Sequence, residues 1–179
     1  MPKEQISYSN IVSCYDSLSK LEARTVQAFH SEYSFAALRL DNEEVIAFAV
    51  EEESVGKWFE VFPICLHSVS LAYPLTWTAL DVPFTVARST MLWREEWLES
   101  AKYSSGLLGS GPHYEQCVST LGSAPKSSAN VVKVLAGIRL SEWHERSLVI
   151  CSSDNTPFKV DLTMDRSEIR EMMKFHTAE

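Results

Sequence analysis

The sequence has no run of basic residues, and this absence argues against a nucleic-acid partner. Sixteen Lys and Arg residues stand against 24 Asp and Glu residues, which gives a formal net charge of -8. A protein with this charge balance repels phosphate backbones at long range. We therefore expect no binding to DNA or RNA.

The sequence also has no long apolar segment and no closely spaced cysteine pair. A membrane-spanning helix needs roughly 20 apolar residues, and no segment comes near that length. No apolar signal region follows the N-terminal residues. The four cysteines, at positions 14, 65, 117 and 151, are too far apart for a paired metal-binding or redox motif. These features predict a soluble, cytoplasmic protein with reduced thiols and no membrane association.

No metal or cofactor motif is present. A zincin motif would need a second histidine at position 148, after His144 and Glu145, and Leu148 stands there. The glycines at 106 and 109 have no lysine after them, as a phosphate-binding loop would require. We therefore expect no metal and no cofactor.

Length and composition fit one ordinary globular domain over residues 1–179. The chain is 45% hydrophobic and 22% charged, and a domain of this size buries a core without a disulfide or a metal. We expect an α+β fold with a mainly antiparallel sheet of about six or seven strands. N-terminal, central and C-terminal helices would pack against that sheet.

The strands are predicted from short apolar runs and period-two alternation. Residues 35–40 and 45–50 flank a polar turn and read as a hairpin. Further strands are expected at residues 57–62, 65–73, 82–86, 132–140, 148–150 and 158–162. Because strand runs follow one another without intervening helices, an antiparallel arrangement is favoured over a doubly wound parallel sheet.

The helices are predicted from three- and four-residue apolar spacing. Such spacing runs from Ile11 to Phe29, with a break between Ser17 and Ser19, and His30 would lie near the end of this helical region. Helix-forming residues cover 94–102. The C-terminal helix has a capping box from Asp165 to Glu168, and Met164 and Ile169 occupy the positions of a hydrophobic staple.

Residues 103–130 have a different composition from the rest of the chain. Four of the six glycines and seven serines fall within this segment. The pattern predicts a long, flexible Gly/Ser/Pro-rich loop that either borders a functional site or is a tolerated insertion.

Two histidines are weak candidates for acid–base catalysis, because both are predicted to lie in loops. His113 follows Gly111 and Pro112 in the long loop, and His144 lies in the turn before Arg146. An enzyme built on either histidine would need an anion-binding group, for which Arg94 or Arg146 are the candidates.

Tryptophans beside charged residues indicate a binding surface, since Trp combines a large apolar area with a polar edge. Trp93 and Trp97 frame Arg94 in one segment, and Trp143 precedes Arg146 in another. We take these five residues as candidate binding residues.

The function that these features favour is a non-enzymatic binding or protein-interaction domain. Its ligand would be a protein partner, with a homodimer as one possibility, or a small molecule. The alternative is a cofactor-free enzyme that acts on a small anionic organic molecule with a loop histidine as acid or base.

Overall fold

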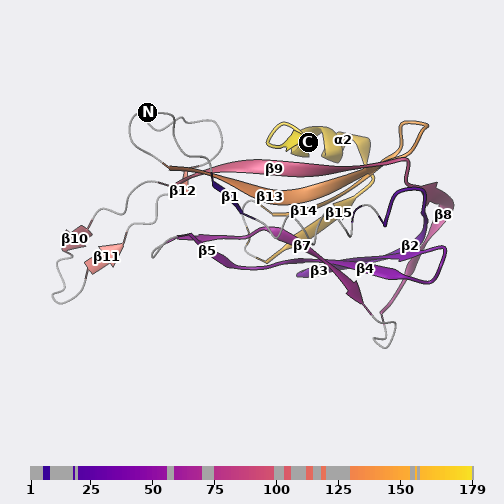
Figure 1. Cartoon of the computed structure of the whole chain (residues 1–179), viewed down its shortest axis with the longest axis horizontal. Helices are drawn as coiled ribbons and strands as arrows, with labels where there is room; N and C mark the ends of the chain where they lie inside the picture. Colours follow the sequence, from indigo (N-terminus) through magenta and orange to yellow (C-terminus); the bar gives the residue numbers. More distant parts are fainter. Residues whose placement is uncertain are drawn as a thin grey trace.

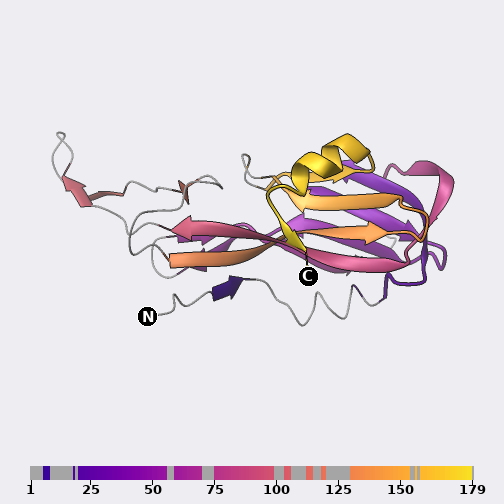
Figure 2. The same ribbon diagram turned by 90° about the horizontal axis from the view of Figure 1, so that it is seen from above.

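Two antiparallel sheets pack face to face in the computed structural model, with one helix on the outer face of one sheet (Figure 1). The structure describes residues 6–8, 18, 20–55, 59–69, 75–98, 103–105, 112–114, 118–119, 130–153, 156 and 158–178. Figure 2 shows the two layers from above, with β9 and β13 as the longest strands.

The first sheet has five strands and contains the predicted hairpin. Its spatial order is β7 (Ile64–Val69), β4 (Val45–Val50), β3 (Phe35–Leu40), β2 (Thr25–Glu32) and β8 (Thr78–Thr85). Neighbouring strands are antiparallel throughout. A separate two-stranded ladder joins β5 (Glu53–Val55) to β6 (Phe59–Val61).

The second sheet has seven strands and is centred on the pairing of β9 with β13. Its main order is β12 (Val118–Ser119), β9 (Arg88–Leu98), β13 (Asn130–Ser141), β14 (Ser147–Ser152) and β15 (Val160–Thr163). Two short strands extend it: β1 (Ile6–Tyr8) pairs parallel with β13, and β16 (Thr177–Ala178) pairs with β9. Outside both sheets, β10 (Tyr103–Ser105) pairs with β11 (Pro112–Tyr114).

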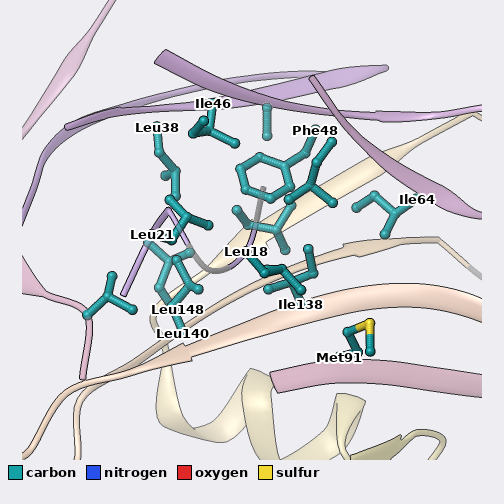
Figure 3. Close-up of a cluster of buried hydrophobic side chains, with 14 of the residues drawn as sticks. Leu18, Leu21, Leu38, Ile46, Phe48, Ile64, Met91, Ile138, Leu140 and Leu148 are labelled. Carbon is teal, nitrogen blue, oxygen red and sulfur yellow. The ribbon is translucent and has the colours of Figure 1, made fainter. Parts of the chain in front are cut away.

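The main core lies between the two sheets, because alternate residues of each strand point into the interface. Leu38 and Phe48 come from the five-stranded sheet, and Ile138 and Leu148 come from the seven-stranded sheet. Figure 3 shows these side chains meeting between the layers, together with Leu18 and other members of the cluster. Leu21 is also fully buried there, so the turn before β2 contributes to the core.

Helix α2 (Arg166–Met172) covers the outer face of the seven-stranded sheet. Ile169 packs there with Leu92 and Val149. The helix begins where the capping box predicts, with Asp165 as N-cap, and its Oδ1 accepts hydrogen bonds from the backbone N–H groups of Ser167 and Glu168 at 2.8 and 3.0 Å. The C-terminal helix prediction is confirmed.

The predicted N-terminal helical region is wrong over residues 25–32, although Leu18 is helical, and the predicted central helix is wrong over residues 94–98. Residues 25–32 form β2 and residues 88–98 form β9, so pairing with neighbouring strands outweighs local helix propensity. Residues 9–17 and 99–102 lie outside the described residues. The sheet-rich, mainly antiparallel character is confirmed, but the strands exceed the six or seven predicted and divide between two sheets.

The predicted long loop falls partly outside the described residues. Within 103–130, the described residues lie in β10, β11, β12 and the start of β13. Among the described residues, no helix has the length and hydrophobicity needed to cross a bilayer.

A glycine allows β13 to approach β14 closely beside a bulge. The register between β9 and β13 shifts between Leu135 and Gly137. A Cβ atom added to Gly137 would lie 2.6 Å from the Cβ of Cys151 and 2.6 Å from the carbonyl oxygen of Ile150. Both distances are far inside van der Waals contact, so the backbone there has no room for a side chain.

Replacing Gly137 with alanine should therefore destabilise the fold by about 1–3 kcal/mol, because the added methyl group overpacks two central strands. Urea unfolding followed by circular dichroism measures this change. The exposed Thr78→Ala control on β8 should stay within about 0.5 kcal/mol of the unmodified chain. Equal unfolding midpoints for Gly137→Ala and the unmodified chain would contradict the close approach of β13 and β14.

The Asp165 cap should also be measurable, and its contribution should depend on pH. Hydrogen bonds from the Ser167 hydroxyl and from the backbone N–H groups of Glu168 and Ser167 lower the pKa of Asp165 below its ordinary value of 3.8. A carboxylate with a lowered pKa stabilises the fold above its unfolded-state pKa and loses that effect as the pH falls through its folded-state pKa.

Asp165→Ala should thus lower the melting temperature by about 2–4 °C near neutral pH, and by less at about pH 3. Differential scanning calorimetry at the two pH values tests both parts. Arg170→Ala, an exposed change within the same helix, provides the control. A loss that is equally large at both pH values would show that the ionised cap is not the cause.

Candidate functional site

The candidate site lies at one end of the sandwich, where edge strand β8 leaves its ladder with β2. Val26 pairs with Phe84, but Ala28 pairs with Ala79, so residues 80–83 lie outside the ladder. Pro83 within this stretch cannot donate a backbone hydrogen bond, which is why proline occurs in edge strands and bulges. The carbonyl groups of the bulge therefore need partners from elsewhere.

Arg146 supplies those partners. Its Nη1 donates to the carbonyl oxygen of Val82 at 3.3 Å, and its Nη2 donates to that of Pro83 at 2.6 Å. The guanidinium carbon also lies 5.6 Å from the centroid of the Phe84 ring, which is within cation–π range. A single arginine thus donates hydrogen bonds to two carbonyl groups of the bulge and packs against the Phe84 ring.

Glu142 holds the arginine in place through a two-point contact. Arg146 Nε donates to Glu142 Oε2 at 2.5 Å, and Arg146 Nη2 donates to Glu142 Oε1 at 2.7 Å. The backbone N–H of Thr85 donates to the same Oε1 at 2.9 Å. We call this arrangement of Glu142, Arg146 and the β8 bulge the Glu142–Arg146 clasp.

The surroundings of Glu142 favour its ionised form. Burial alone would raise the pKa of Glu142, since its side chain is only 11% exposed. The hydrogen bonds from Arg146 and Thr85 and the charge of Arg146 outweigh that effect and lower the pKa below 4.5. The clasp is therefore an ion pair at neutral pH.

The clasp joins the two sheets and shapes the β13–β14 turn. Residues 142–146 connect β13 to β14 in the seven-stranded sheet, whereas β8 belongs to the five-stranded sheet. The turn is closed by a hydrogen bond from the backbone N–H of Glu142 to the carbonyl of Arg146 at 3.0 Å, and Glu145 adopts a φ of 69°. Figure 1 shows this turn and β8 at the same end of the molecule.

Two apolar side chains project from this clasped end. Trp143 is 84% exposed and Val82 is 59% exposed. We call these two residues, carried by the turn and the bulge, the Trp143 tip. Large apolar side chains with this degree of exposure are the informative exception on a protein surface.

Three of the predicted site residues, Trp143, His144 and Arg146, therefore lie together in one turn. His144 is exposed beside Trp143. Arg146 was predicted as an anion-binding group, and the structure engages its guanidinium with the chain's own Glu142. Sequence reasoning missed Glu142 and Val82, although the four-residue spacing of Glu142 and Arg146 and the proline in β8 are visible signals.

The other predicted site residues lie elsewhere. Trp93 belongs to the core between the sheets and is 4% exposed, and Arg94 is 6% exposed, so neither offers an exposed contact. Trp97 pairs with Val131 and Ser119 in the seven-stranded sheet. His113 lies in β11 opposite Ser104. The side chains of Trp97 and His113 are outside the part that the structure describes.

Comparison with known proteins finds no matching family model, no matching curated protein and no matching solved structure. Within the described ranges, no three His, Cys, Asp or Glu side chains gather closely enough to hold a metal ion. A proposal about function therefore rests on the geometry of the chain itself.

The clasp should contribute to stability, because removing Arg146 leaves a mostly buried carboxylate and two backbone carbonyls without their donor. Arg146→Met should cost about 2 kcal/mol, and Arg146→Lys should cost less because it keeps the charge but loses the two-point contact. Urea unfolding measures both. Arg166→Met is the matched control, since Arg166 forms only an exposed 3.9 Å ion pair with Glu145. Equal losses at Arg146 and Arg166 would refute the role of the clasp.

Proposed function

We propose that this chain is a non-enzymatic binding domain that contacts a protein partner through the Trp143 tip. The observation that carries the proposal is the 84% exposure of Trp143 on a turn held by a two-point ion pair. Tryptophan is among the residues most enriched in the energetic centres of protein interfaces. Burial of this indole by a partner would remove a large apolar surface from water.

The rigidity of the tip supports the same proposal. The clasp joins the turn to β8 through four hydrogen bonds that Arg146 donates, two of them to Glu142 in the same turn, and one that the backbone N–H of Thr85 donates to Glu142. A contact surface that is already ordered loses little conformational entropy on binding. The net charge of -8 favours a protein partner over nucleic acid. We also propose a cytoplasmic location, since the cysteine spacing shows no disulfide framework.

The enzyme alternative rests on His144 or His113 as acid or base. A shallow, open hollow lies beside α2 and is lined by Ser167, Glu168, Arg170, Glu171 and Met172. His144 does not line this hollow, and no observation favours catalysis over binding. The binding domain is therefore the function that we propose.

Trp143→Ala should abolish partner binding without a loss of stability, because the side chain is exposed. Tyr33→Ala is the matched control, since Tyr33 is an aromatic residue that is 59% exposed at the other end of β2. Affinity capture from cell extract with the three chains, quantified by mass spectrometry, should show a protein retained by the unmodified chain and Tyr33→Ala. Its recovery with Trp143→Ala should fall by about tenfold or more.

Sedimentation of the purified chains decides whether the partner is a second copy. A dimer that dissociates on Trp143→Ala but not on Tyr33→Ala would identify self-association. Identical capture and identical sedimentation for all three chains would refute the binding role of the Trp143 tip.

A further inference from the structure

The outer face of the five-stranded sheet carries a row of small side chains between two histidines. The register pairs His30 with Ala37, Ala37 with Ala47, and Ala47 with His67 across four strands. Directly opposed residues point to the same face. The two alanines are buried beneath partly buried apolar side chains, namely Phe35, Leu75 and Trp77. The alanines thus form a low floor, and the larger aromatic side chains of Phe35 and Trp77 pack on it.

Arg39 lies beside this floor, and one of its buried nitrogen atoms has no hydrogen-bond partner among the described residues. It stands two residues after Ala37 on β3, so both side chains point to the same face. Its guanidinium carbon lies 5.5 Å from the centroid of the Trp77 ring. Its Nε is buried, and among the described residues it has no hydrogen-bond partner. A buried donor without an acceptor is costly and uncommon in native proteins.

His30, on the neighbouring strand β2, also has a buried ring nitrogen without a hydrogen-bond partner among the described residues. Its Nδ1 lies 2.9 Å from the carbonyl oxygen of Thr76, so Nδ1 carries a proton and donates it. Its Nε2 is buried without a hydrogen bond in the described part of the chain. Glu32 Oε1 lies 3.9 Å from that nitrogen, which is beyond hydrogen-bond distance. Two buried nitrogens with unmet hydrogen-bonding capacity therefore face the same side of the sheet.

We propose that Arg39 and His30 form a binding site for a carboxylate group on this face, covered by Trp77, which we call the Arg39 site. Arginine presents parallel N–H donors whose spacing matches the two oxygens of a carboxylate. A bound carboxylate would accept from Arg39 Nε and from one Nη, and its position near His30 would bring an acceptor to Nε2. This site is separate from the Trp143 tip and does not depend on its function.

Trp77 is the side chain that must move for the carboxylate to enter. Its ring lies over Arg39 and makes an edge contact with His30, with 6.4 Å between the ring centroids. The indole therefore lies against both side chains that would bind the carboxylate. Because its displacement opposes binding, a simple carboxylate should bind weakly, with a dissociation constant that is roughly millimolar.

The charges around the site predict a proton linkage. Because His30 donates from Nδ1, its Nε2 donates to a carboxylate only when the ring is protonated. The charged and titratable groups nearby are Arg39 on β3, Glu32 on β2, and the exposed pair of His67 and Glu51, whose Nε2 and Oε1 atoms are 2.9 Å apart. Residues 75–77 bring no titratable group. Carboxylate binding should thus be accompanied by proton uptake at His30.

The test follows the Arg39 Nε–H signal by NMR during titration of the full chain with acetate, benzoate and an acetylated tripeptide with a free C-terminus. Acetamide and sodium chloride serve as neutral and ionic controls. We expect saturable shifts with the three carboxylates and none with the controls. Tighter binding of benzoate would identify a small aromatic acid as the natural source of the carboxylate, and tighter binding of the tripeptide would identify a chain terminus.

Variants distinguish binding at the Arg39 site from non-specific attraction of anions to the protein. Arg39→Lys, followed through backbone amide signals of β3, should weaken acetate binding by about tenfold or more. Arg24→Lys should leave it unchanged, because Arg24 lies 3.8 Å from Asp41 and is 42% exposed. Trp77→Ala should strengthen acetate binding, since the covering ring is gone. Lack of saturable binding in both the unmodified chain and Trp77→Ala would overturn the proposal.

The pH dependence tests the part assigned to His30. Acetate affinity should rise as the pH is lowered if protonated His30 donates to the carboxylate, and His30→Gln should remove this dependence while the Arg39 signal still shifts. Affinity that does not change with pH in the unmodified chain would overturn the assignment of His30 to the site.

Discussion

Apolar side chains at alternate positions of the two sheets pack together and are buried from water. The arrangement of the other elements depends on this contact. Leu38 and Phe48 from one sheet meet Ile138 and Leu148 from the other. Once these faces are buried, strand register is no longer adjustable, because a shift by one residue would turn every apolar side chain outward. The two outer faces then differ: α2 covers one, and Trp77 with its neighbours covers part of the other.

Sequence reasoning succeeded where local signals and tertiary contacts agree. The hairpin of β3 and β4 and the capped helix α2 each carry their own turn or cap residues, so residues 35–50 and 165–172 are read correctly from nearby positions. It failed at β2, although its partner β3 is the next strand in the chain, and at β9, whose partner β13 is distant in the chain. Residues 94–98 are good helix formers, yet pairing with β13 places them in a strand.

The candidate sites show the same division. Trp143, His144 and Arg146 share one turn, so their proximity is visible in the order of the sequence. The ion pair of Arg146 with Glu142 and its contact with β8 depend on the packing of two sheets, which no short motif encodes. The Arg39 site was missed entirely, since His30 was assigned to a helix end. His30 lies on β2, which pairs with β3, the strand that carries Arg39.

The connection between β9 and β13 has a consequence for how the fold can vary in evolution. Leu98 pairs with Asn130, so the two strands of the longest ladder are joined by residues 99–129. The entropy of closing such a connection rises only with the logarithm of its length, by about 0.6 kcal/mol for each doubling. An insertion or deletion in this connection outside β12 should therefore change the free energy of chain closure only slightly. The pairing of β9 with β13 joins positions that are remote in the chain, and such long-range pairing favours slow folding.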